Sequence, residues 1–102
     1  MGGSFRFPEI ILFDWDEYNK YKNRLKHKVT QIECEEVFIN DPIYFKDEKH
    51  SQTEERYLAY GETTINRIST IVFTLRNDKI RVISARNQSK KERLIYKKYK
   101  EN

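Results

Sequence analysis

Two arginines, Arg81 and Arg86, lie in the apolar segment 80–86 (Ile-Arg-Val-Ile-Ser-Ala-Arg). One guanidinium group can hold two phosphate oxygens at once, so the two arginines predict a clamp for one phosphate, with Arg56 assisting. A regular strand would point the two arginines to opposite faces, and they share a face only if the strand ends or bulges near Ala85. The alternative is that both are surface residues paired with carboxylates: Glu54, Glu55 or Glu92.

The charge of the chain is unevenly distributed. Residues 1–75 hold 10 Lys and Arg against 13 Asp and Glu, whereas residues 76–102 hold 10 against 3. A basic segment on a mildly acidic body favours a polyanion or an acidic partner, and the alternative is a solvated basic helix. The basic residues expected to contact RNA in the last segment are Lys90, Lys91 and Arg93.

Candidates for proton transfer are few. RNA cleavage without a metal needs a base for the 2′-OH, cations for the phosphate and an acid for the departing 5′-oxygen. His27, beside Lys26, titrates near neutrality, and its alternative role is a favourable interaction with a helix C-terminus. Tyr96 could move a proton or stack on a base, or it could simply pack in the core. Arg56 would supply a third cation.

Several classes of site are excluded. The two histidines, His27 and His50, are far apart in sequence, so no metal-ligand motif is present, and we expect neither metal nor cofactor. No glycine-rich phosphate loop and no marked serine nucleophile is present. Cys34 is the single cysteine, and no apolar run is long enough to span a membrane. We therefore expect a cytoplasmic protein with no membrane partner.

Periodicity predicts an α+β domain. Residues 1–9 are expected to be a flexible leader, and residues 10–102 a single domain. Either Asp14 or Asp16 is expected to cap a helix, with Asp16 favoured, and Trp15 is expected to anchor the core or to offer a base-stacking surface. The expected elements are a strand over 10–15, helices over 17–27 and from 31 to Asp41-Pro42, strands over 43–45, 56–61, 67–75 and 80–85, and a helix over 90–100 that Ser89 caps.

The second helix has the clearest start. Thr30-Gln31-Ile32-Glu33 fits a capping box, and the residue before Pro42 is pushed out of the helical region. The strands that follow are joined by short turns, including 76–79, and should form an antiparallel meander. The N-terminal strand and the two first helices should cover one face of it, which leaves the other face, with the basic last helix, for a ligand.

The order and spacing of several motifs resemble the BrnT family of toxins. The most specific pieces are Trp15-Asp16, the segment 26–29 (Lys-His-Lys-Val) and the arginine segment 80–86, within a resemblance that covers roughly residues 11–96. The resemblance implies a RelE-like fold and a metal-independent ribonuclease that inhibits translation within a type II toxin–antitoxin system. It implies an active site at the matching positions, which are Lys26, His27, Arg56, Arg81, Arg86 and Tyr96.

The resemblance also implies partners. These are an RNA substrate and a BrnA-type antitoxin with a ribbon-helix-helix domain, through which alone operator DNA would be bound. The main alternative is a non-catalytic module that binds RNA or the antitoxin. A repressor that binds DNA alone is disfavoured, because the chain has no helix-turn-helix signature.

Overall fold

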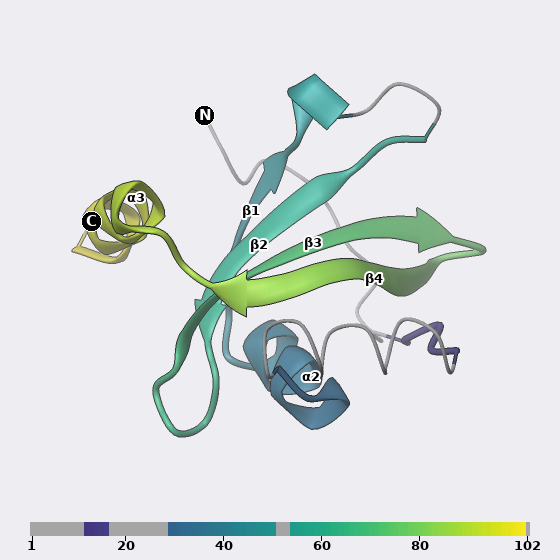
Figure 1. The fold of residues 1–102 in the computed structure, drawn as a ribbon, viewed down its shortest axis with the longest axis horizontal. Coiled ribbons are helices and arrows are strands. Elements are labelled where there is room, and N and C mark those ends of the chain that lie inside the picture. The colour runs from purple at the N-terminus through teal and green to yellow at the C-terminus, as the bar shows by residue number, and fades with distance from the viewer. Residues whose placement is uncertain (1–11, 17–28, 51–53, 102) are drawn as a thin grey trace.

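A computed structural model describes residues 12–16, 29–50 and 54–101, and within them the chain is an α+β protein. Figure 1 shows its elements, with α2 beneath the sheet and α3 at the end where β4 finishes. In chain order they are α2 (Gln31–Ile39), β1 (Ile43–Lys46), the 3₁₀ helix η1 (Glu48–His50), β2 (Tyr57–Glu62), β3 (Ile68–Arg76), β4 (Lys79–Asn87) and α3 (Lys90–Glu101).

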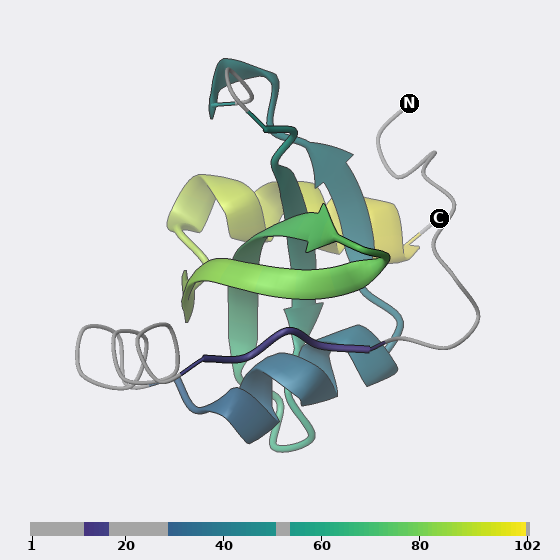
Figure 2. The same ribbon diagram turned by 90° about the vertical axis from the view of Figure 1, so that its right-hand side faces the viewer.

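The four strands form the predicted meander. Their order in the sheet is β1-β2-β3-β4, and every neighbouring pair is antiparallel. The predicted N-terminal strand is represented among the described residues by one parallel bridge between Phe13 and Ile80. Its segment, 12–16, runs along β4 beside α2 (Figure 2). The predicted helix over 17–27 lies outside the described residues.

Local signals set the ends of α2 as predicted. The Glu33 amide donates to the Thr30 hydroxyl at 3.1 Å, and the Thr30 amide donates to the Glu33 carboxylate at 3.0 Å, which completes the capping box. The helix ends at Ile39 with Asn40 as its C-cap, and Asp41 then adopts a φ of 56° before Pro42. None of the described helices has the length and the apolar run that crossing a membrane would require.

The hydrophobic core lies between α2 and one face of the sheet. Phe38 of α2 meets Phe73 of β3 edge to face, with ring centroids 5.1 Å apart. Gly61 of β2 lies so close to the helix that a Cβ there would be 2.9 Å from Val37. The fully enclosed core comprises Val29, Cys34, Val37, Phe38, Ala59, Ile71, Phe73, Ile80, Val82 and Ala85.

The turn between β3 and β4 has two residues. Asn77 and Asp78 have φ values of 50° and 64°, the left-handed pair that favours Asn and Asp in hairpins of this length. The predicted tight turn is confirmed. It places the start of β4 opposite the end of β3, and this fixes the register of the arginines that follow.

Candidate functional site

The face of the sheet opposite α2 carries polar side chains and is contacted by α3. Thr70, Val72 and Thr74 of β3 lie on this face, because their neighbours Ile71 and Phe73 belong to the core. We call it the α3 face. Tyr99 of α3 packs on Phe45 of β1 there, with ring centroids 5.5 Å apart, so α2 and α3 lie on opposite faces of the sheet.

A bulge in β4 brings the two arginines onto the same face. Val72 pairs with Ser84, but the next residue, Phe73, pairs with Val82, so Ile83 has no counterpart. The extra residue reverses the alternation of side chains along the strand. As a result Arg81 pairs with Thr74 and Arg86 pairs with Thr70, both on the α3 face. The strand therefore contains the bulge that the two arginines need in order to share a face.

Arg81 is held by two carboxylates from the N-terminal segment. It donates to Asp16 at 2.6 Å and lies 3.8 Å from Asp14. The hydrogen bond to Asp16 raises the pKa of Arg81, and the charges of Asp14 and Glu54 act in the same direction. Its side chain is 22% exposed, so this ionised group is fixed in place and can be reached from solvent.

Arg86 is held by the first turn of α3. It donates to both oxygens of Glu92, at 2.7 and 2.9 Å, and Thr70 donates to the same carboxylate at 3.0 Å. Glu92 also accepts from the Ser89 amide at 2.8 Å and completes a second capping box. Burial would raise the pKa of Glu92, but these hydrogen bonds outweigh it and lower the pKa to about 2.

Arg56 lies near Arg81. It precedes Tyr57, the partner of Phe73 in β3, and the Glu55 carbonyl accepts from the Thr74 hydroxyl at 2.8 Å. Arg56 therefore stands beside the residue that pairs with Arg81, and it is half-buried. The register separates Arg86 from this pair by four residues of β3, or roughly 13 Å.

Arg81 and Arg86 both pair with carboxylates, but only one of the pairings was expected from the sequence. Glu92, one of the three expected partners, pairs with Arg86. Arg81 pairs instead with Asp14 and Asp16, either of which was expected as a helix cap. Sequence distance hides this contact, since Asp16 and Arg81 are 65 residues apart.

Tyr96 lies on the buried side of α3, next to Glu62 and Ile68. It is 6% exposed, and burial, with the charges of Glu62 and Asp41, raises the pKa of its hydroxyl. Lys90, Lys91 and Arg93 are exposed on α3. The remaining predicted site residues, Lys26 and His27, lie outside the described residues.

Trp15 has a packing role. Its ring lies against the core, stacked on Phe13 at 6.1 Å between centroids, and its indole N–H donates to Glu35 at 2.9 Å. This agrees with the expected core anchor. In the part of the chain that the structure describes, no three carboxylate, histidine or cysteine side chains come together as ligands for a metal.

A comparison with known families decides the identity. The sequence model of a family described as "Ribonuclease toxin, BrnT, of type II toxin-antitoxin system" matches residues 15–92. The chain belongs to the BrnT family. The match includes the paired arginines of β4 and the aspartate that holds Arg81. No curated protein matches the sequence. The BrnT family is one of ribonuclease toxins, so an RNA substrate and an antitoxin partner follow from membership.

Proposed function

We propose that this BrnT-family protein cleaves RNA without a metal ion on the α3 face, and that Arg81 holds the phosphate that is attacked. The observation that supports this is the bulge at Ile83, because it puts Arg81 and Arg86 on the same face, with Arg81 close to Arg56. The bulge puts two cationic side chains on the same face of the strand, and such an arrangement suits a polyanionic ligand.

In the proposed reaction the 2′-oxygen attacks the adjacent phosphorus and the bond from phosphorus to the 5′-oxygen breaks. The products are a 2′,3′-cyclic phosphate and a free 5′-hydroxyl. Arg81 and Arg56 neutralise the charge that builds up on the phosphate oxygens. One general base takes the 2′-OH proton and one acid protonates the 5′-oxygen, and His27 is the candidate for one of these roles. Tyr96 is buried beside Glu62 and Ile68, away from Arg81, so the proposal gives it no part in proton transfer.

The distance between Arg81 and Arg86 is too great for both to hold one phosphate. Since Arg86 lies roughly 13 Å along β3 from Arg81, we assign Arg86 to a different phosphate of the same RNA strand. Arg81 has five N–H donors, and the contacts to Asp14 and Asp16 fix its terminal nitrogens without using all of them. The two aspartates would thus orient Arg81 toward RNA.

The basic residues of α3 would draw RNA toward this face. Lys90, Lys91 and Arg93 are exposed on α3, which follows the end of β4. Lys26, in the N-terminal half of the chain, is proposed to bind RNA as well. Their contribution is electrostatic, so the KM for RNA should rise steeply with salt concentration.

The proposal extends to the cell. The protein would inhibit translation in the cytoplasm, a BrnA-type ribbon-helix-helix antitoxin would neutralise it, and operator DNA would be bound through that antitoxin. We also propose that the arrangement of helices and sheet is of the RelE type. These points rest on the resemblance of the sequence to its family.

The test is cleavage of a labelled RNA by the purified protein in EDTA. Arg81→Ala should lower kcat by about 10²–10³-fold, because one preorganised charge on the transition state is lost. Arg76→Ala is the control: it removes an exposed arginine from the end of β3, whose only described partner is Glu54 at 3.9 Å. It should keep kcat within about twofold of the wild type. A requirement of the wild type for Mg²⁺, or equal losses in both variants, would refute the mechanism.

One observation favours the alternative of a non-catalytic binding module. Both arginines of β4 are already paired with carboxylates in the free chain. Such a module would bind RNA or the antitoxin without turnover. Protein that retains RNA on a filter and yields no cleavage products after long incubation would support it.

A further inference from the structure

A second basic surface lies at the C-terminal end of α3. A hollow of about 580 Å³ opens there between α3 and the adjoining ends of β2 and β3. We call it the α3 hollow. Tyr96 and the half-buried Ile68 supply apolar walls. The full lining is Glu62, Ile68, Arg93, Tyr96, Lys97, Lys100 and Glu101.

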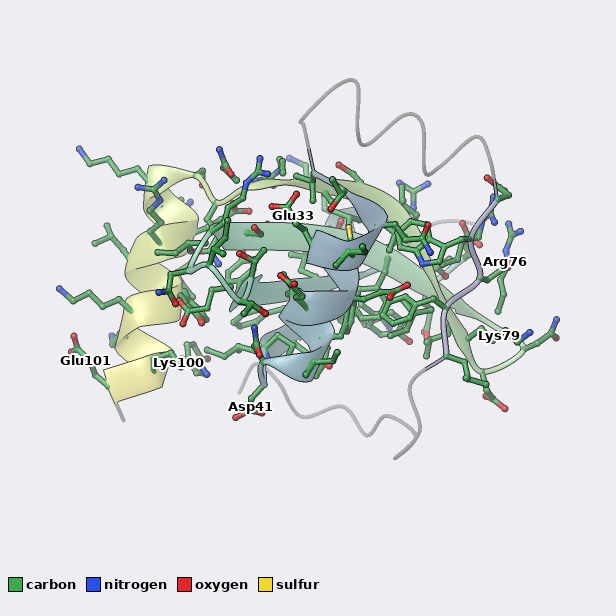
Figure 3. The ribbon with its side chains drawn as sticks, turned by 90° about the horizontal axis from the view of Figure 1, so that it is seen from below. Glu33, Asp41, Arg76, Lys79, Lys100 and Glu101 are labelled. Carbon is green, nitrogen blue, oxygen red and sulfur yellow. The ribbon has the colours of Figure 1, made fainter. Side chains whose placement is uncertain are left out.

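The α3 hollow lies on the far side of α3 from Arg81. Glu62 pairs with Ile68 at one end of the sheet, while Arg81 pairs with Thr74, six residues or roughly 20 Å further along β3. Between them Glu92 joins α3 to Thr70. Figure 3 shows Lys100 and Glu101 at the opposite end of the molecule from the β3–β4 turn. RNA lying on the arginine row would therefore not fill the α3 hollow.

Cations of this hollow are available to a ligand. Four arginines elsewhere, Arg67, Arg76, Arg81 and Arg86, have carboxylate partners. Within the described ranges, neither Arg93 nor Lys97 has an ion pair or a side-chain hydrogen bond, and both are exposed. They stand one helical turn apart, so they face the same side of α3.

Lys100 extends the row by another turn. Its ammonium group donates to the Asp41 carbonyl at 3.0 Å and lies 5.8 Å from the centre of the Tyr96 ring. These two contacts restrict the position of the Lys100 ammonium group over the Tyr96 ring. The surface thus has cations repeated along a helix, above an apolar wall.

We propose that the α3 hollow is a docking site for an acidic, amphipathic segment of the antitoxin. The inference rests on the proposed function for the identity of the partner. An apolar side chain of the segment enters between Ile68 and Tyr96, and its carboxylates meet Arg93 and Lys97. The charge of α3, with six Lys and Arg against two Glu, is complementary to such a segment.

A pair of neighbouring lysines offers a matched test. Lys97 lines the α3 hollow and Lys98 does not, and both are exposed on the same helix. The cognate antitoxin is titrated into the wild type, Lys97→Glu and Lys98→Glu by calorimetry. Lys97→Glu should weaken binding about tenfold or more, since reversal leaves a carboxylate of the segment facing another carboxylate. Lys98→Glu should change the affinity less than about threefold.

RNA cleavage by the same three proteins separates the two proposals. Both variants should cleave RNA at the wild-type kcat, and their melting temperatures should agree. Equal antitoxin affinities for Lys97→Glu and Lys98→Glu would overturn the docking site while leaving the ribonuclease intact. A larger loss in cleavage than in antitoxin affinity for Lys97→Glu would make the hollow an RNA site and would also overturn it. Absence of cleavage by the wild type would count against the proposed function alone.

Discussion

Replacing Glu92 with glutamine removes one negative charge from the point where α3 meets the sheet. The carboxylate accepts hydrogen bonds from Arg86, Thr70 and Ser89, and its side chain is 14% exposed. The pKa of Glu92 falls from 4.5 to about 2. Each pKa unit corresponds to about 1.4 kcal/mol, so the ionised form contributes up to about 3 kcal/mol to the free energy of unfolding at neutral pH.

The pH dependence has a definite sign. Because the folded state lowers the pKa, the stabilisation is complete above pH 4.5 and is lost as the pH falls toward about 2. Urea unfolding of Glu92→Gln should therefore give a free energy of unfolding up to about 3 kcal/mol below the wild type at pH 7. The gap should close as the pH falls through that window, until the two proteins are equally stable.

The control is Glu101→Gln, an exposed position in the last turn of the same helix. It removes the same charge, with an expected change of less than about 0.5 kcal/mol at any pH. A loss below about 1 kcal/mol for Glu92→Gln at pH 7, or a loss that does not vary with pH, would show that Glu92 does not fasten α3 through its charge.

Three further outcomes are expected. Gly61→Ala should destabilise the protein by about 1–3 kcal/mol, because its Cβ would lie 2.9 Å from Val37 and 3.0 Å from Pro42; an unchanged urea midpoint would contradict this close approach. Thr30→Ala should cost about 1 kcal/mol by removing the α2 cap, and Thr30→Ser should restore it. Burial raises the pKa of the Cys34 thiol to about 12, so a thiol reagent should label Cys34 only as fast as the protein unfolds.

Elements specified by short-range chemistry could be predicted from the sequence. The capping box at Thr30 and Glu33 involves residues three apart, and the turn at Asn77 and Asp78 depends on two adjacent residues that tolerate a positive φ. The meander followed from strands joined by short connections. Each of these needs only local information.

The geometry of the candidate site depends on long-range contacts, and the sequence did not reveal it. The bulge at Ile83 is fixed by how β4 pairs with β3, and no residue type marks it. The partnership of Asp16 with Arg81 requires the N-terminal segment to lie along β4. The sequence left open whether Tyr96 moves a proton, stacks on a base or packs, and only the packing of α3 on the sheet shows that Tyr96 is buried.

The unmatched residue at Ile83 makes the spacing between Arg81 and Arg86 as important as the arginines themselves. Deleting that single residue would remove the bulge and leave Arg81 and Arg86 four positions apart, so both would still share one face of a regular strand. With the present spacing of five positions, pairing of β4 with β3 without the bulge would instead turn one guanidinium inward toward α2 and leave the other outside. A homologue with the five-position spacing therefore needs the same irregularity to present both arginines together, whereas a homologue with one residue fewer does not.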